Sequence, residues 1–322
     1  MMAIPYDTTN AGVSVRDALG HSSVKDGNTW RHVEKIHVKD GSTWRETDEV
    51  YVKSGGSWRL VHEGEHFLFN VSLSGNDSSS DWSLSNYISN QGYSGNKIKG
   101  LVTVTANSRR RQVNLGSFSS DSLVYLRIEL NARIQARGGN GGNATGAGSG
   151  SGPNGSNGQR ALYTRTPFIL DNASIIAGGG GGGGGGKNSY NQYIDQQSYP
   201  CQKGSTCYQD TTVQDFIYGG GGGGGAGYPN SNGGSGGASG GNGGAGTYNS
   251  GGGKGTAANN PQSGVSSHQG GDGGNLGQNG QNGFGGGGNA GSAGTAINGW
   301  SYRAGESGNG YNQTNIRGPK NN

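Results

Sequence analysis

Glycine is the residue that most restricts how this chain can fold. Sixty of its 72 glycines lie between residue 138 and the C-terminus at residue 322, and they include unbroken tracts at residues 178–186 and 219–225. Few aliphatic side chains follow Ile176, so this segment cannot build an ordinary apolar core. It is therefore either a disordered linker or an architecture held by backbone hydrogen bonds, in which a Cβ has no room.

The entries to the glycine tracts favour order. Residues 124–137 alternate between apolar and polar side chains, which predicts one half-buried strand, and they run straight into Gly138. Residues 167–177 enter the nine-glycine tract in the same way, without the charged or proline-rich residues that would mark a linker. A strand that continues directly into a glycine tract indicates that the tract is ordered too.

Polyglycine-II helices satisfy these constraints. Such a helix has three residues per turn, and its N–H and C=O groups bond to neighbouring helices because it has no internal hydrogen bonds. Glycines spaced by three, as at Gly152, Gly155 and Gly158, fit this period, whereas the broken triplet phase and the scarcity of proline exclude collagen. We predict antiparallel polyglycine-II helices over residues 138–322, with all-glycine tracts in the interior; flexible disorder is the alternative.

The N-terminal segment carries a 14-residue repeat. The pattern Val-Lys-Asp-Gly-x-x-Trp at residues 24–30 recurs at 38–44 and, with Ser for Asp, at 52–58. Each unit predicts one strand and one tight turn, and three units predict a β-meander in which the alternating apolar residues share one face. We expect Trp30, Trp44 and Trp58 to form a core or a docking surface toward another subunit rather than a sugar platform.

Between the repeats and the glycine-rich segment lies a β-rich block. Its predicted strands cover residues 67–73, 82–89, 97–105, 112–118 and 124–137. The sequence thus predicts a mainly β protein with three parts: an N-terminal β-meander over residues 1–64, a β-rich spacer over 65–137 and a polyglycine-II domain over 138–322.

Composition and motifs exclude several function classes. The formal charge of +4 suits an anionic surface such as lipopolysaccharide phosphates, but it also simply favours solubility. We find no nucleophile elbow, phosphate loop, metal-spaced His/Cys cluster or aromatic-studded basic groove, so we expect no enzyme, no cofactor, no metal and no nucleic-acid partner. The start has no signal-peptide pattern and no apolar run long enough to span a membrane. The polar, Asn/Ser/Gly-rich composition with one close cysteine pair nevertheless looks extracellular. We therefore expect synthesis in the cytoplasm and exposure after lysis, a history that fits a virion component.

The strand-then-glycine junctions and the alternation of glycine tracts with polar segments resemble the receptor-recognising adhesins at the tips of T-even-type bacteriophage long tail fibres. The resemblance covers roughly residues 124–322. It implies a polyglycine-II sandwich whose loops bind outer-membrane proteins or lipopolysaccharide. The N-terminal repeats are similar to short β repeats of phage tail proteins but are not the attachment domain of that family, so the mode of docking to the virion stays open.

Receptor contacts are expected in the segments that interrupt the glycine tracts, above all in a long loop at residues 187–218. This loop is rich in Tyr, Ser, Asn and Gln, the composition of an adaptable binding surface. Cys201 and Cys207 within it either form a small disulfide ring or stay free thiols. A second candidate lies at Trp300, either a receptor anchor or a cap on the glycine stack. The candidate contact residues are Tyr190, Tyr193, Asp195, Tyr199, Tyr208, Asp210, Trp300 and Tyr302.

The sequence therefore predicts a non-enzymatic phage tail adhesin, either a monomeric tip or a homotrimer. Its expected partners are a tail fibre or baseplate protein and a bacterial surface receptor, and its expected location is the virion tail. A structural cap or spacer without receptor contact is the first alternative. An ice-binding protein is the second, although the Tyr-rich loop argues against a flat ice-binding face.

Overall fold

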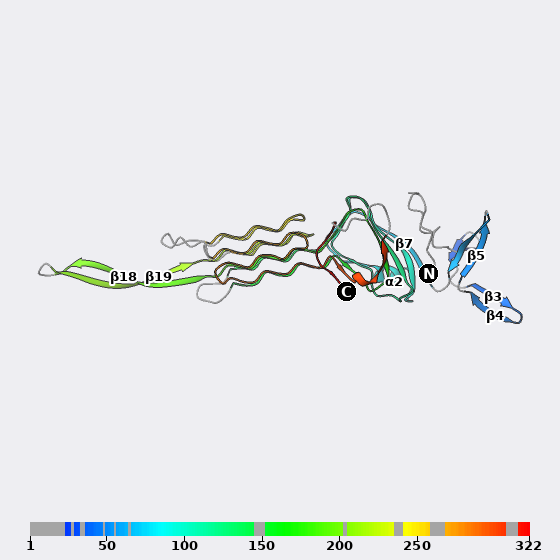
Figure 1. Ribbon diagram of the computed structural model, residues 1–322, viewed down its shortest axis with the longest axis horizontal. Coiled ribbons are helices and arrows are strands. Elements are labelled where there is room, and N and C mark those ends of the chain that lie inside the picture. The colour runs from blue at the N-terminus through cyan, green and yellow to red at the C-terminus, as the bar shows by residue number, and fades with distance from the viewer. Residues whose placement is uncertain are drawn as a thin grey trace.

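The molecule is elongated, with short hairpins at one end, a three-sided β domain, a bundle of extended glycine-rich segments and one long hairpin at the other end (Figure 1). It is mainly β, and one short α-helix occurs among the described residues. The computed structural model describes residues 23–26, 29–32, 36–47, 49–54, 56–63, 66–144, 152–201, 205–234, 241–257, 268–306 and 315–322.

The N-terminal repeats form separate hairpins. In the described residues each repeat makes its own two-stranded antiparallel sheet, with the tight turn inside the repeat. The strands are β1 (Ser23–Asp26), β2 (Thr29–His32), β3 (Ile36–Asp40), β4 (Thr43–Thr47), β5 (Glu49–Ser54) and β6 (Ser57–Glu63). The expectation of one continuous meander was wrong, because each repeat closes on itself and leaves no pairing between repeats in these sheets.

The shared apolar face expected from parity is wrong for the same reason. Across the turn of the second hairpin, Lys39 pairs with Trp44 and Val38 pairs with Arg45. Directly paired residues share a face, so Trp44 lies on the face opposite to Val38. Both side chains are well exposed, Trp44 at 65%. Trp30 and Trp58 take the same place in the register, each paired with a lysine.

The central domain is a parallel β-solenoid. Its strands follow one another around three five-stranded sheets, so that each strand pairs in parallel with the strand one turn later. The first sheet holds β7 (Phe67–Leu73), β10 (Ile98–Val104), β13 (Leu123–Ile128), β16 (Phe168–Asn172) and β21 (Arg303–Glu306). The second holds β8 (Asn76–Asp77), β11 (Arg109–Arg110), β14 (Arg133–Gln135), β17 (Ile175–Ala177) and β22 (Ile316–Arg317). The third holds β9 (Trp82–Ser83), β12 (Val113–Asn114), β15 (Leu162–Tyr163), β20 (Ile297–Asn298) and β23 (Lys320–Asn321).

Alternating apolar residues fill the solenoid. Val124, Leu126 and Ile128 point inward from β13 and are fully buried, and Phe168 and Leu170 stack beside them from the next turn. Stacked turns bury a continuous column of such side chains that no single turn could bury alone. This column is the main apolar core of the described chain.

Two strand predictions in this domain were wrong. Residues 124–137 form two strands rather than one, because the chain turns a corner where Asn131 takes a left-handed backbone conformation and Leu130 is exposed. Residues 82–89 contain only the short β9, followed by α2 (Leu84–Asn90). The Ser83 side chain accepts a hydrogen bond from Asn86 N and caps this helix, while Leu84 and Ile88, four residues apart, pack into the core.

The glycine-rich segments are insertions into two turns of the solenoid. Residues 136–161 connect β14 to β15, and residues 178–296 connect β17 to β20. The chain then returns to complete the last turn with β21, β22 and β23. Both insertions leave and re-enter between the second and third sheets, so the glycine segments begin side by side on one corner. The expected division into a β-rich spacer up to residue 137 and a glycine-rich domain after it does not describe this arrangement, because later strands return to the solenoid.

The tract at residues 178–186 lies inside the glycine bundle. Its N–H groups donate with a period of three to three different segments: Gly179, Gly182 and Gly185 donate to residues 153–159, Gly180, Gly183 and Gly186 to residues 220–226, and Gly181 and Gly184 to residues 278–281. Its carbonyls accept from residues 139–142, 271–274 and 288–294. The tract is thus bonded on all sides, and a Cβ on Gly182 would overlap the carbonyl oxygen of Asn140. The tract at residues 219–225 is surrounded in the same way.

Asparagine side chains replace missing neighbours at the surface of the bundle. In the outer segment at residues 288–294, every third N–H bonds inward to the central tract. The N–H groups of Asn289 and Ser292 donate instead to the side-chain oxygens of Asn154 and Asn157, at 2.8 Å each. The N–H groups on the remaining side of this segment, those of Ala290 and Ala293, donate to the side-chain oxygens of Asn282 and Asn279 at 2.7 Å. Asparagine at a period of three therefore satisfies backbone groups where a further glycine segment would otherwise be needed.

Two glycine-to-alanine changes test the packing of the bundle. We expect Gly182→Ala to destabilise the protein by about 3 kcal/mol or more, because the added methyl group meets fixed backbone rather than a movable side chain. Gly253→Ala is the matched control, since nothing lies within 4 Å of its added Cβ, and we expect a change within about 1 kcal/mol. Denaturant unfolding of both variants measures the difference; equal stability would contradict the packing described here.

Candidate functional site

The glycine segments define an end of the molecule that points away from the solenoid. Gly178 follows β17 directly, so the tract at residues 178–186 runs outward and Gly186 lies at its far end. Hydrogen bonds place other segment ends beside it: Gly186 N donates to Gly220 O, and Gly220 N donates to His268 O. We call the residues at which the segments reach this side the distal end: Asn143, Gly186, Gly234, Thr256, His268 and Phe284.

A long β-hairpin projects from the distal end (Figure 1). It consists of β18 (Ser189–Pro200) and β19 (Thr206–Ile217), paired in antiparallel register over their whole length. The loop expected over residues 187–218 is therefore a regular hairpin, a difference that tyrosine, threonine and valine at many of its positions explain. Asn188 and Ile217 are buried at its base, where the Asn188 side chain accepts a hydrogen bond from Gly219 N.

The register divides the expected contact residues between two faces. Tyr208, Asp210 and Ile194 lie on one face, since they pair with Ser198, Gln196 and Thr212. Asp195 and Tyr199 lie on the other. Ile194, Tyr208 and Tyr199 are exposed by 65%, 61% and 48%. The side chains of Tyr190 and Tyr193 lie outside the described residues, although their backbone belongs to β18.

Amide and carboxylate groups accompany these apolar side chains. Gln196 Nε2 donates to Asp210 Oδ1 at 3.0 Å across the hairpin, and Gln197 Nε2 lies 3.5 Å from Asp195 Oδ2. Each face thus presents an acidic group beside exposed apolar surface, an arrangement suited to sugar hydroxyls or to backbone N–H groups of a protein.

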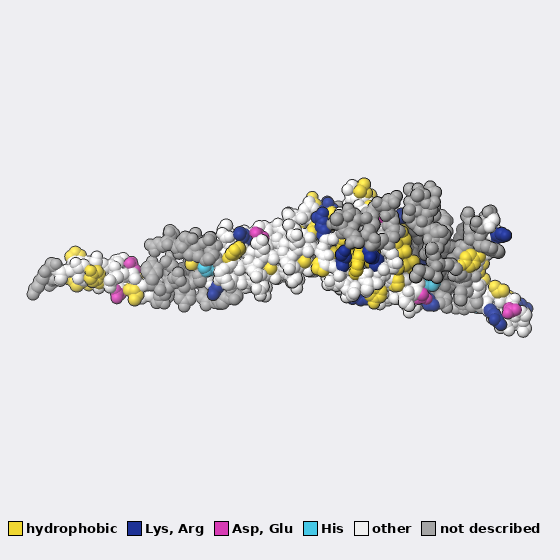
Figure 2. All heavy atoms as spheres, in the orientation of Figure 1, with side chains coloured by type: hydrophobic (Ala, Val, Ile, Leu, Met, Phe, Trp, Pro, Cys, Tyr) yellow, Lys and Arg dark blue, Asp and Glu magenta, His cyan; other side chains and the backbone are white. Residues whose placement is uncertain are grey.

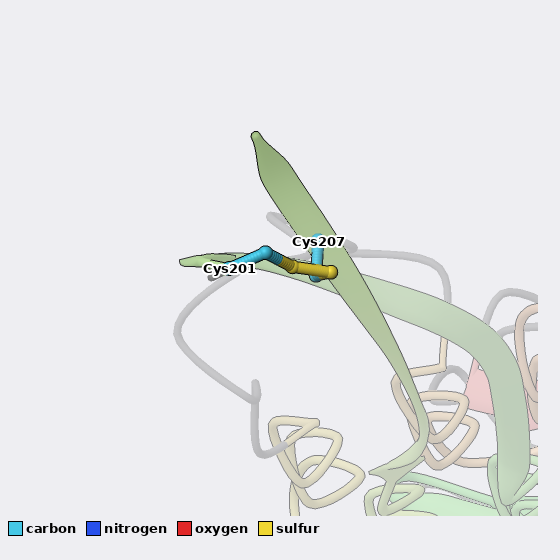
Figure 3. Close-up of a disulfide and its surroundings, with 2 residues drawn as sticks. All are labelled: Cys201 and Cys207. Carbon is cyan, nitrogen blue, oxygen red and sulfur yellow. A yellow bond between two sulfur atoms is a disulfide. The ribbon is translucent and has the colours of Figure 1, made fainter. Parts of the chain in front are cut away.

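A disulfide between Cys201 and Cys207 closes the tip of the hairpin (Figure 3). Cys207 pairs with Tyr199 in the strand register, so the bridge lies next to one of the exposed tyrosines. A two-stranded hairpin is marginally stable by itself in water, and a covalent link at its tip restricts its unfolded states. The bridge therefore favours an ordered tip.

One family model matches most of the chain. The model of the phage tail fibre adhesin Gp38 family matches residues 69–320, which include the solenoid, the glycine segments and the hairpin. The chain belongs to this family. It is thus a phage adhesin located in the virion tail, associated with the tail fibre, that binds a receptor on the host surface. Neither the curated proteins nor the solved structures gave a match.

The remaining contact candidates of the adhesin lie far from its hairpin. Trp300 and Tyr302 belong to the 3-10 helix η1 (Trp300–Tyr302) beside β20 and β21 of the solenoid. Arg303 and Lys320 cover the Trp300 ring at 4.0 and 4.8 Å, and this ring packs against the solenoid core. Basic and hydrophobic side chains gather on this part of the solenoid in Figure 2. Trp44 lies on a repeat hairpin beyond the solenoid, so the candidates do not form one site.

The distal end of the adhesin also carries groups that sequence inspection missed. Lys254 Nζ lies 4.8 Å from the centre of the Phe284 ring, and Phe284 is exposed. Burial, and then the charge of Lys187, hold the pKa of His268 below its ordinary value, so this imidazole stays neutral at neutral pH. These residues are far apart in the sequence and have no common motif, so only the return of separate glycine segments to one end brings them together.

Within the described ranges, no helix is long and apolar enough to cross a membrane. In that same part of the chain, no group of three or more His, Cys, Asp or Glu side chains is arranged to hold a metal ion.

Removing the disulfide tests whether it orders the tip. We expect Cys201→Ser together with Cys207→Ser to lower the local stability of the hairpin by about 2 kcal/mol, the loop-closure contribution of so small a ring. Amide exchange over residues 194–212 would then become faster, whereas the melting temperature of the whole protein would stay unchanged because the hairpin projects from the bundle. A large fall in the global melting temperature would contradict this local role.

Proposed function

We propose that the glycine segments of this adhesin are polyglycine-II helices packed as a sandwich. The observation behind this proposal is the period of three in the hydrogen bonds of residues 178–186, where positions i, i+3 and i+6 donate to the same neighbour. A helix with three residues per turn presents its N–H groups in this way. The sandwich supplies a stiff support that needs no apolar core, so side chains at its distal end are available for recognition.

The distal end, and above all the long hairpin, is proposed as the receptor-recognising surface. The single observation that carries this is the exposure of Ile194, Tyr199 and Tyr208 on a hairpin that no other described strand covers. Large apolar side chains contribute only a little to the stability of an isolated hairpin while both its faces stay in water. Their burial by a partner explains their presence, and aromatic anchors are typical of binding hot spots.

The proposed ligand is a surface glycan or an outer-membrane protein. Tyrosine rings stack on the apolar faces of sugars, while Asp195, Asp210 and the neighbouring amides accept or donate hydrogen bonds to hydroxyl groups. The free strand edges also allow a protein receptor to pair with the hairpin by strand addition. The hairpin chemistry is compatible with both classes, which share the need for an ordered aromatic tip.

Docking to the virion is proposed for the opposite end. The repeat hairpins precede the solenoid, and Trp44 and Val38 are exposed on opposite faces of the second one. Two exposed apolar faces on one small hairpin suit burial between neighbouring chains of a fibre or baseplate protein. This arrangement separates docking from receptor recognition along the length of the molecule.

Cell binding by hairpin variants tests the proposed receptor surface. We expect the purified chain to bind intact host cells, and the triple variant Ile194→Ala, Tyr199→Ala, Tyr208→Ala to bind at least about tenfold more weakly, since hot-spot truncations commonly exceed this. Variants of a single face, Ile194→Ala with Tyr208→Ala or Tyr199→Ala alone, identify which face contacts the receptor. Fluorescent labelling and flow cytometry measure the binding.

Leu130→Ala is the matched control for this experiment. Leu130 is an exposed apolar residue at a corner of the solenoid, 67% accessible, so its truncation removes similar surface away from the hairpin. Unchanged binding by the triple variant would refute the hairpin as the receptor surface. Failure of the unmodified chain to bind any host cell would favour a structural cap or spacer instead.

A further inference from the structure

A polar cavity lies at the end of the glycine segments next to the solenoid, opposite to the hairpin. It has a volume of about 550 Å³ and is lined by the turn Leu276–Gln278 together with Asn249, Asn275, Arg317 and Gly318. Arg317 belongs to β22 of the solenoid and Gly318 follows it directly, whereas the other walls come from turns between glycine segments. The volume falls in the range of small-molecule sites.

The walls of this cavity are rich in hydrogen-bond donors. The side-chain oxygen of Asn249 accepts from Arg133 Nη1 at 3.0 Å, and that of Asn275 accepts from Gly251 N at 3.2 Å. These bonds occupy the amide oxygens and leave the amide nitrogens as donors. Arg317 adds a guanidinium group, and no carboxylate is among the described residues that line the cavity.

Positive charge accumulates behind these walls. Arg109 and Arg133 lie 4.3 and 5.8 Å from the centre of the Tyr248 ring. Burial, then Arg109, and less strongly Arg317, lower the pKa of Arg133. None of these three arginines has an acidic side chain within 4.0 Å in the part of the chain that the structure describes.

Three other arginines of the solenoid form ion pairs. Arg110 lies 3.4 Å from Asp77, Arg111 lies 2.9 Å from Asp81, and Arg127 lies 3.0 Å from Asp171. Arg109, Arg133 and Arg317 differ from these three arginines because they have no acidic partner among the described residues. Like charges at close range repel, and an anion bound among them would relieve this repulsion.

We infer that this cavity binds a phosphorylated sugar. The dianionic phosphate would be bound by Arg317 and stabilised by the charges of Arg133 and Arg109, since guanidinium groups match phosphate oxygens in pairs. The amides of Asn249, Asn275 and Gln278 would donate to the hydroxyl and ring oxygens of the sugar. This site goes beyond the proposed function, because it lies at the end of the glycine segments opposite to the hairpin and needs none of the hairpin residues.

Calorimetry with a simple probe tests this inference. We expect glucose 6-phosphate to bind the full chain at low salt and glucose not to bind. Arg317→Gln should weaken glucose 6-phosphate binding by about tenfold or more, the usual effect of removing a charged hydrogen bond. Arg160→Gln is the matched control, because it removes the same charge from an exposed arginine that does not line the cavity, and it should leave the affinity unchanged.

Further measurements distinguish recognition of the sugar from recognition of the phosphate alone, and a loss of the site from a loss of folding. Gln278→Ala should weaken the binding of glucose 6-phosphate more than the binding of inorganic phosphate, because Gln278 is expected to contact the sugar. Arg317 and Gln278 are both exposed, so circular dichroism and melting should show folded variants. Equal affinity for inorganic phosphate and glucose 6-phosphate would overturn the sugar assignment. Absence of binding by the unmodified chain, or equal binding by Arg317→Gln, would overturn the site.

Discussion

The backbone hydrogen bond between neighbouring glycine segments is the interaction on which the rest of this structure depends. Each segment in the bundle is extended and has no internal bonds to rely on, so its N–H and C=O groups must find partners in other segments. The central tract at residues 178–186 achieves this on all sides, and it does so only because no Cβ separates the backbones. Stability that most domains derive from apolar burial here comes from close backbone contact.

The solenoid complements this bundle by supplying the apolar core that the bundle lacks. Its stacked turns bury Val124, Leu126, Ile128 and their neighbours, and the glycine segments leave from two consecutive turns of the same stack. Because both insertions leave and return at the same corner of the solenoid, their first and last segments are held at a fixed spacing. The solenoid thus limits the conformational freedom of glycine, which is otherwise the most costly residue to order. At the far end, the side-by-side packing of the segments gathers the hairpin base, His268 and Phe284 into one surface.

Much of the architecture was predictable from local patterns. The inward-facing residues of β13 follow from alternation, and the glycine requirement follows from composition. The strand predictions were wrong at two places. Asn131 turns the chain at a corner and divides residues 124–137 into two strands, and Ser83 caps a helix where a strand was predicted. In the repeats, the prediction that residues of the same parity share a face was wrong. Each turn pairs odd-numbered with even-numbered positions, so Trp44 and Val38 lie on opposite faces. The candidate contact residues were dispersed for a similar reason, since strand register, not proximity in the sequence, decides which side chains share a surface.

The sequence by itself determined that the glycine tracts within residues 138–322 need neighbouring backbones without Cβ wherever they are ordered, that strands precede these tracts, and that a Tyr-rich segment with two cysteines interrupts them. The tertiary structure decided which segments are neighbours, that residues 297–321 return to the solenoid, and that the hairpin and the arginine-lined cavity lie at opposite ends of the bundle. The physical reason is that every glycine tract presents the same backbone N–H and C=O groups for hydrogen bonding. Pairing among identical backbones carries no sequence signal, so connection lengths, asparagine side chains and the solenoid corner select the arrangement.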